Sequence, residues 1–218
     1  MTSSLDAALE RAQTFSAFSD HVRHLCSDAD LEVVVAVAQR ALAAGEAEAV
    51  TVFDDATGRR TEVEAESRGG PREAAGSILQ RLQPGLPAER SGPGRPKLGV
   101  VSREVSLLPR HWDWLATRPG GASGAIRRLV DEARKLRRAQ DASLAAHEAL
   151  DRAMTVLAGD QVGFEEALRA LYQHQYDRVI TLMANWPADL RAHFEHRISL
   201  AGELFELARL ESLQHEGR

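Results

Sequence analysis

The chain has 218 residues, of which 44% are hydrophobic and 5% aromatic, and its formal net charge is −5. It is long enough to bury a core, but it has no apolar run of the ~18 residues that a membrane span requires and no signal-peptide pattern at its start. The single cysteine, Cys26, excludes an intrachain disulfide and a multi-cysteine zinc site. We therefore expect a cytoplasmic protein with no membrane partner.

Charge is distributed unevenly along the chain. Residues 90–138 hold twelve Lys and Arg residues against four Asp and Glu residues, whereas the flanking segments are acidic. A basic centre of this kind indicates a polyanionic partner, of which nucleic acid is the first to consider. The alternative is a basic helix face that is balanced by acidic neighbours.

Residues 14–66 are predicted to form a small α+β domain with the element order β-β-α-β-β. Short apolar and polar residues alternate over 14–27 and indicate two short strands. Asp28 or Asp30 is then a suitable N-cap for a helix that ends at Gly45. The preceding residues 1–13 are predicted to form a frayed helical turn or a disordered tail.

The second half of this domain is predicted to be a hairpin. Residues 50–53 form one strand, residues 54–58 the turn, and residues 61–65 the return strand, in which apolar residues alternate with glutamates. Asp54 and Asp55 lie next to each other in the turn. Because Asp side chains cap the amides of turns, we interpret both as turn residues and not as a catalytic pair.

Residues 67–99 are rich in Pro and Gly and are predicted to be a linker that holds one short helical piece. Within the linker, Gly94-Arg95-Pro96-Lys97 resembles the core of an AT-hook. In that motif an extended Arg-Pro pair lies in the narrow minor groove of A·T-rich DNA. Arg95 and Lys97 are therefore candidate DNA contacts, and a simple hinge is the alternative.

Residues 100–138 combine a short strand with two helices. The strand ends at Pro109, which suits the first turn of a helix over 109–117. Pro119-Gly120-Gly121 ends this helix, and Ser123 is the predicted N-cap of a second helix that runs to Arg138 or continues as far as Gly159.

This strand-helix-helix pattern resembles the ribbon-helix-helix family of bacterial DNA-binding proteins, typified by the methionine (MetJ) and Arc repressors. The resemblance implies a homodimer whose paired strands enter the major groove, while the start of the second helix holds a phosphate. With the arm, it implies DNA contacts by Arg95, Lys97, Ser102, Arg103, Ser106, Arg110, Ser123, Gly124 and Arg127. It also implies a dimer interface of Val105, Leu107, Leu108, Trp112, Leu115, Ile126, Leu129 and Val130.

Residues 139–218 are predicted to form an acidic helical domain, with seven Arg against thirteen Asp and Glu residues. Amphipathic patterns indicate two or three helices after residue 159, separated at Trp186-Pro187. His193 and His196 share one predicted helix face. Because the sequence offers no further ligands beside them, we interpret them as solvated or capping residues and expect no metal site. No phosphate-binding loop or catalytic set is present, so we expect neither a cofactor nor an enzyme.

The complete chain also resembles an uncharacterised bacterial domain-of-unknown-function family, whose members share phrases such as VFDDATGR, GRPKLGV and LPRHWDWLA-x-x-PGGAS. These phrases fall at residues 52–59, 94–100 and 107–123. The leading hypothesis is a dimeric DNA-binding protein, either a transcriptional regulator or an architectural protein, that binds DNA non-specifically or at A·T-rich sites. The alternative is an antitoxin-like or scaffold protein that uses residues 100–138 only to dimerise and binds a protein partner through its acidic C-terminal helices.

Overall fold

In the computed structural model, which describes residues 2–20, 22–65, 70–84 and 103–216, the chain divides into two compact units. The first unit consists of Met1–Gly85 and Ala139–Arg218, and the second consists of Leu86–Arg138. The segments 14–66 and 139–218 therefore contribute to the same unit. The fold is mixed α+β and mostly helical, as the sequence predicts at this coarse level.

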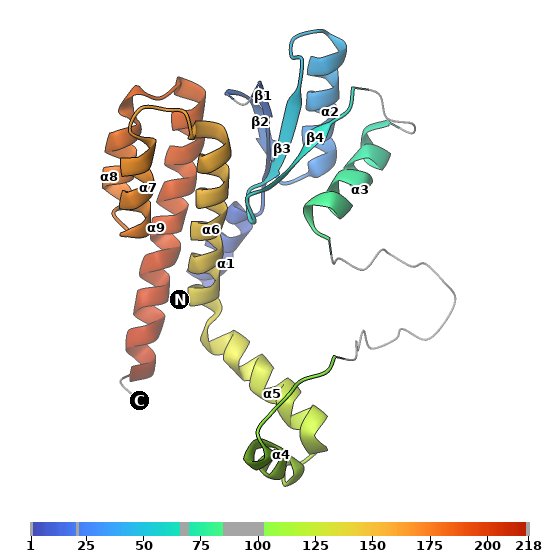
Figure 1. Ribbon diagram of the computed structural model, residues 1–218, viewed down its shortest axis with the longest axis vertical. Helices are drawn as coiled ribbons and strands as arrows, with labels where there is room; N and C mark the ends of the chain where they lie inside the picture. The colour runs from blue at the N-terminus through green and yellow to red at the C-terminus, as the bar shows by residue number, and fades with distance from the viewer. Residues whose placement is uncertain (1, 21, 66–69, 85–102, 217–218) are drawn as a thin grey trace. The chain divides into compact units, whose positions relative to one another are not determined.

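The first unit contains a four-stranded antiparallel sheet in the order β2-β1-β3-β4 (Figure 1). Its strands are β1 (Phe15–Ser19), β2 (Arg23–Asp28), β3 (Val50–Asp54) and β4 (Arg59–Val63), and helix α2 (Leu31–Ala43) joins the two hairpins. The predicted β-β-α-β-β order is thus confirmed. Each hairpin pairs strands that are close in sequence, and the pairing of β1 with β3 joins the two.

Local sequence signals explain where these elements begin and end. The Asp30 side chain accepts a hydrogen bond from the Glu32 amide at 2.9 Å and caps α2, as predicted. Gly45 follows the helix with a φ of 70°, and Gly58 closes the β3-β4 turn with a φ of 66°. Glycine adopts this left-handed region without the steric cost that a Cβ atom would impose.

The sheet is covered on both faces. On one face, Ala17, Val50 and Val52 are buried against α2 and α3 (Gly70–Leu82). On the other face, Phe18 and Phe53 belong to a buried cluster with residues from the C-terminal helices. Because successive strand residues point to opposite faces, strands buried on both sides become apolar almost throughout, and all five residues of β3 are buried.

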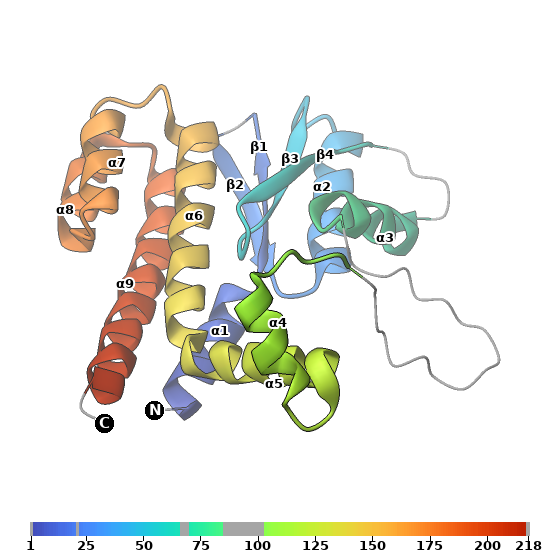
Figure 2. The same ribbon diagram turned by 60° about the horizontal axis from the view of Figure 1, so that its bottom comes forward.

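The C-terminal helices form the second layer. Helix α6 (Arg138–Ala158) and helix α9 (Ala188–Glu216) run antiparallel (Figure 2). The Glu211 side chain near the end of α9 accepts a hydrogen bond from the Ala139 amide. Helices α7 (Phe164–Tyr172) and α8 (Tyr176–Leu182) complete this layer, followed by a short 3-10 turn at Met183–Asn185. The predicted boundary at Trp186-Pro187 is confirmed, and a further break falls at His174.

Two predictions for the first unit are wrong. Helix α1 (Thr2–Ala12) is not a frayed tail, because Leu5, Ala8 and Ala12 are buried with residues of α9. Helix α3, predicted as a short helical piece of the linker, is a core helix whose buried residues include Ile78 and Leu82. In both cases, the apolar stripe lies against another part of the chain, and this burial stabilises a helix that would be marginal alone.

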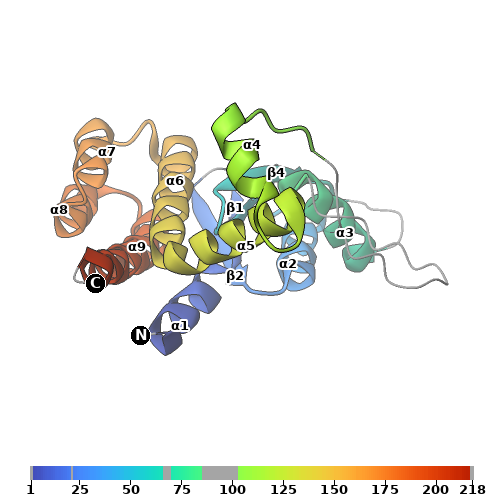
Figure 3. The same ribbon diagram turned by 90° about the horizontal axis from the view of Figure 1, so that it is seen from below.

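The second unit contains two helices, α4 (Pro109–Ala116) and α5 (Gly121–Leu136), which pack against each other (Figure 3). Arg137, with a φ of −117°, interrupts the helical path, so the second helix does not continue to Gly159. Residues 103–108 form no strand in the single chain. The strand predicted before Pro109 is therefore absent from its described part, residues 103–108.

Candidate functional site

The α4-α5 pair is the part of the structure in which the predicted DNA and dimer contacts fall. Pro109 occupies the first position of α4, as predicted, and Leu108 before it is extended. Gly120 has a φ of 85° and is the N-cap of α5, so the helix begins at Gly121. The prediction that Ser123 caps this helix is therefore wrong, since Ser123 already lies within its first turn.

Most of the predicted dimer residues are exposed in the single chain. Leu115 is buried, and Leu107 and Ile126 are partly buried. In contrast, Val105 is 55% exposed and Val130 49%, and the side chains of Leu108, Trp112 and Leu129 are similarly exposed. Trp114, beside them on α4, is also exposed. The two helices thus present large apolar side chains that the described residues leave exposed.

The predicted DNA contacts are only partly described by the structure. Arg103, Ser106, Arg110 and Arg127 are all exposed. Ser123 is exposed on the first turn of α5, and Gly124 follows it within the helix. Arg95, Lys97 and Ser102, including the AT-hook-like arm, lie outside the described residues. The described candidates therefore share solvent access and, in three cases, positive charge.

Two arginines of this unit have roles that the sequence did not indicate. The Arg118 guanidinium lies 4.0 Å from the centre of the Trp114 ring, in a cation–π contact. Arg128 donates a hydrogen bond to the Pro119 carbonyl at 2.8 Å. Both contacts fix the turn between α4 and α5, so we assign these two arginines to local structure.

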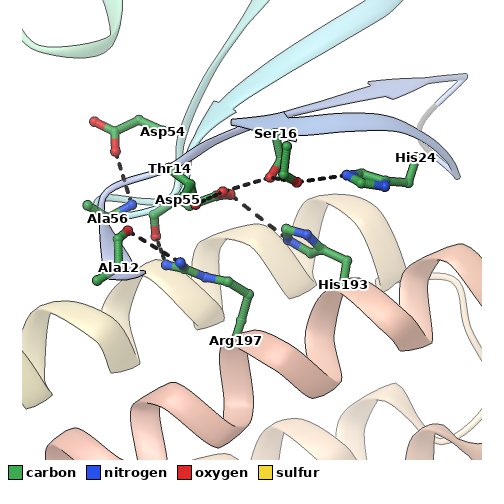
Figure 4. Close-up of polar contacts among 10 residues, drawn as sticks. Ala12, Thr14, Ser16, His24, Asp54, Asp55, Ala56, His193 and Arg197 are labelled. Carbon is green, nitrogen blue, oxygen red and sulfur yellow. Dashed lines mark hydrogen bonds and ion pairs between the residues drawn. The ribbon is translucent and has the colours of Figure 1, made fainter. Parts of the chain in front are cut away.

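A buried polar cluster forms the most elaborate side-chain arrangement in the first unit (Figure 4). Its centre is Asp55, which is 6% exposed. One oxygen of its carboxylate accepts hydrogen bonds from the hydroxyls of Thr14 and Ser16, both at 2.6 Å. The other oxygen lies 4.0 Å from Nε2 of His193. The prediction that Asp55 caps a turn amide is therefore wrong, whereas Asp54 does cap the turn by accepting from the Ala56 amide.

Helix α9 supplies the opposite side of this cluster. Arg197 is buried and donates hydrogen bonds to the backbone carbonyls of Ala12 and Asp55. Arg197 thus connects three segments that are far apart in sequence, namely the end of α1, the β3-β4 turn and α9. A buried charge of this kind needs such partners to offset its lost hydration.

Electrostatics explains the charge state of the cluster. Burial raises the pKa of the Asp55 carboxyl, and Arg197 and the two hydroxyl donors act in the opposite direction. Burial, together with Arg197, lowers the pKa of His193 to about 3. His193 is therefore neutral at pH 7, and its contact with Asp55 is not an ion pair. The prediction that His193 is solvated or capping is wrong, because its side chain is only 7% exposed.

A β-bulge extends the cluster towards the surface. The pairing of β1 with β2 shifts between Ala17 and Phe18, which places His24 and Ser27 on the same face of the sheet. Nε2 of His24 lies 2.8 Å from Oγ of Ser27, and Oγ of Ser27 lies 2.7 Å from Oγ of Ser16. A chain of hydroxyl groups thus leads from buried Asp55 to exposed Ser27.

Sequence reasoning missed this cluster because its members come from four separate segments. Two local signals were present: Thr14 and Ser16 are spaced for one face of a strand, and His193 and Arg197 are spaced for one face of a helix. Nothing in the sequence states that these two faces meet. Among the described residues, no three His, Cys, Asp or Glu side chains converge in a way that could hold a metal ion.

These observations define an α+β protein with a buried polar cluster beneath a four-stranded sheet and a basic helix pair in a second unit. Comparison with family models matches residues 14–198 to DUF2239, described as an uncharacterized protein conserved in bacteria. The chain belongs to this family, as the sequence predicts. Comparisons with curated proteins and with solved structures give no match. No helix in the described part of the chain is long and apolar enough to cross a membrane.

Proposed function

We propose that the protein is a cytoplasmic, dimeric DNA-binding protein, a regulator or an architectural protein, in which the second unit both dimerises and contacts DNA. The observation that carries the proposal is the composition of the α4-α5 surface. Large apolar side chains and arginines are exposed on the same two helices. An apolar surface of this kind marks an interaction site, and the positive charge favours a polyanion as the second partner.

Dimerisation would give the segment 103–108 a pairing partner and would bury exposed apolar side chains. Val105 and Leu108 are exposed on an unpaired extended segment, and Leu129 and Val130 are exposed on α5. In the ribbon-helix-helix arrangement that the sequence resembles, two such segments pair into an antiparallel ribbon and the helices pack beneath it. This pairing satisfies the backbone of residues 103–108 and removes apolar surface from water at the same time.

The charge of the described part of this unit supports DNA as the ligand. Residues 103–138 carry nine Lys and Arg residues against four Asp and Glu residues. Arg103, Arg110 and Arg127 make no ion pair with an acidic side chain among the described residues. Each cation that neutralises a phosphate releases a counterion, which favours binding at low salt.

The decisive measurement is a fluorescence anisotropy titration of the full chain on random and A·T-rich duplexes at several salt concentrations. We expect the logarithm of the affinity to fall linearly with the logarithm of the salt concentration, by about 0.9 for each neutralised phosphate. Replacing Arg103, Arg110 and Arg127 together by Ala removes six cations from a dimer and is expected to reduce that slope by up to about 5. No binding at low salt, or binding that is indifferent to salt, contradicts the proposal.

A matched variant controls for net charge. Arg40, Arg60 and Arg81 are exposed arginines of the first unit. Their replacement by Ala removes the same charge from the chain but leaves the second unit intact. We expect this variant to keep the salt slope of the unmodified protein. Equal losses in both triple variants indicate a general charge effect and not a site.

The competing function is a protein-interaction module that dimerises without contacting DNA. It is favoured by one observation, since Glu104 and Val105 are both exposed on the segment that would enter the groove. A carboxylate there repels phosphate. A dimer in analytical ultracentrifugation, together with no salt-dependent DNA binding, supports this alternative with a protein partner at the acidic C-terminal helices.

A further inference from the structure

A groove between α8 and α9 lies in the first unit and shares no residue with the cluster around Asp55. Its volume is about 680 Å³, which is within the range of about 300–1,000 Å³ that is common for small-molecule sites. Its lining combines an aromatic wall with a charged rim. The wall consists of His174, Tyr176 and Phe205, and the rim carries Asp177, Arg178 and Glu206.

The aromatic wall is held in place by its own contacts. The rings of His174 and Phe205 are stacked, with centroids 4.2 Å apart and an interplanar angle of 16°. Nδ1 of His174 lies 3.1 Å from the Tyr176 hydroxyl, and the Tyr176 ring meets Phe205 at 60°. The rings therefore form a preorganised surface, and a flat ligand that binds there loses little binding free energy to the ordering of side chains.

Two backbone features maintain this wall. His174 has a φ of 55°, a left-handed conformation that residues with a Cβ atom adopt at a cost. Gly202 lies in the middle of α9, where glycine weakens a helix, and a Cβ atom there would lie 3.3 Å from the Tyr176 ring. The left-handed backbone of His174 and the glycine within α9 each reduce stability, and both lie beside the same three rings.

The buried side chain of His147 contacts the aromatic wall. The His147 ring lies 5.4 Å from His174, and its Nδ1 atom is buried without a hydrogen-bond partner in the described part of the chain. Burial lowers the pKa of His147, so its imidazole is neutral at pH 7. The wall is therefore backed by an uncharged group.

The rim supplies charge of both signs. Arg178 is exposed, and its side chain hydrogen-bonds only to the amide oxygen of Gln175, at 3.2 Å, so its guanidinium is not neutralised by an acid among the described residues. Guanidinium groups bind phosphate oxygens through paired N–H donors. Asp177 and Glu206 offer carboxylate acceptors, which are suited to the hydroxyl groups of a sugar. One carboxylate oxygen of Glu206 also pairs with Arg209 at 3.1 Å.

We propose that this groove binds a nucleoside monophosphate. The base stacks on the ring wall, the ribose hydroxyls donate to the carboxylates of the rim, and Arg178 holds the phosphate. Aromatic side chains stack on bases regardless of sequence, because every base has a π face. This site is separate from the basic surface of the second unit and does not depend on the proposed DNA binding.

Isothermal titration calorimetry of the full chain with AMP, GMP, CMP and UMP, and with adenosine, tests the site. We expect saturable binding of at least one nucleotide. Arg178→Ala is expected to weaken binding of the nucleotides about tenfold and to leave adenosine unaffected, because only the phosphate contact is lost. Phe205→Ala is expected to weaken both about tenfold through lost stacking.

Two further variants keep the test interpretable. Arg169→Ala removes an exposed arginine of α7 that does not line the groove, and we expect it to bind like the unmodified protein. Phe205→Leu keeps an apolar side chain without the ring, and replaces Phe205→Ala if circular dichroism shows that the latter does not fold. Failure of all four nucleotides to bind, or nucleotide binding by the Arg178 and Phe205 variants that equals that of the unmodified protein, overturns the proposal.

Discussion

Apolar side chains are buried to a different extent in the two units. In the first unit, Phe194, Met154 and Leu157 are fully or almost fully buried in a cluster that joins α6, α9 and the sheet. In the second unit, Trp112, Leu129 and Leu136 are at least 41% exposed. Among the described residues of the second unit, only Leu115 and Ala125 are buried apolar side chains, whereas the first unit holds three buried clusters. This difference supports the interaction surface that we propose for the second unit.

Charged side chains also differ in burial between the two units. Asp55 and Arg197 are buried and hydrogen-bonded within the first unit. Arg103, Arg110 and Arg127 are in solvent. A buried charge that is satisfied by its own chain fixes one arrangement of that chain, while an exposed charge remains available to a ligand.

The largest loss of stability is expected when a substitution creates a cavity in the core of the first unit. Phe194→Ala removes a fully buried ring that also meets Trp186 edge to face. We expect the free energy of unfolding to fall by about 3–5 kcal/mol. Urea denaturation followed by circular dichroism measures this loss. A change below about 1 kcal/mol shows that the cluster is not a packed core.

A substitution in the β3-β4 turn tests how much the contact between this turn and α6 contributes to stability. At Gly58 a Cβ atom would lie 2.5 Å from the Ala149 carbonyl oxygen of α6, and the φ of 66° is itself unfavourable for alanine. We expect Gly58→Ala to cost about 2–3 kcal/mol, through strain and displacement of the turn. Gly45→Ala is the control, because its φ is similar but no atom lies within 4 Å. Equal costs in both variants show that the contact with α6 is unimportant.

The buried histidine predicts a pH dependence. The pKa of His193 is about 3 in the folded protein but about 6.5 in an unfolded chain. The unfolded state therefore binds more protons below pH 6.5, and stability falls as the pH falls through that range. His193 alone accounts for a loss of about 2 kcal/mol between pH 6.5 and pH 5.

Comparison with His193→Gln isolates this contribution. The raised pKa of Asp55 acts in the opposite direction, since stability linked to it is present at low pH and lost as the pH rises. Asp55 is present in both proteins, so the difference between their pH profiles reports mainly on His193. Urea denaturation at pH 7, 6 and 5 gives both profiles. Parallel profiles contradict a buried neutral imidazole.

The smallest effect on stability is expected in the second unit. Leu129→Ser replaces a side chain that is 45% exposed, so the unfolding free energy of the first unit should change by less than about 0.5 kcal/mol. The same variant is expected to shift the protein from dimer to monomer in analytical ultracentrifugation. Leu144→Ser, at an exposed leucine of α6 in the first unit, is the control and should leave the dimer intact. A dimer unchanged by Leu129→Ser contradicts the proposed interface.

Sequence patterns predicted the elements best where the signal is local. The β-β-α-β-β order, the Asp30 cap, the glycine positions and the start of α4 at Pro109 all depend on residues within a few positions of one another. The error at Ser123 has the same origin. Ser123 is a good N-cap by residue type. However, Gly120, three residues earlier, adopts the left-handed conformation and is the N-cap of the helix.

By itself, the sequence determined the classes of element, the uneven charge and membership of the DUF2239 family. Only the tertiary structure decided that α1 and α3 belong to the core and that Asp55, Ser16, His193 and Arg197 meet. It also decided which apolar side chains of α4 and α5 are exposed in the described part of the chain. The physical reason is the range of the interactions. Caps, turns and periodicity act over a few residues, whereas burial depends on which distant segments the fold brings together.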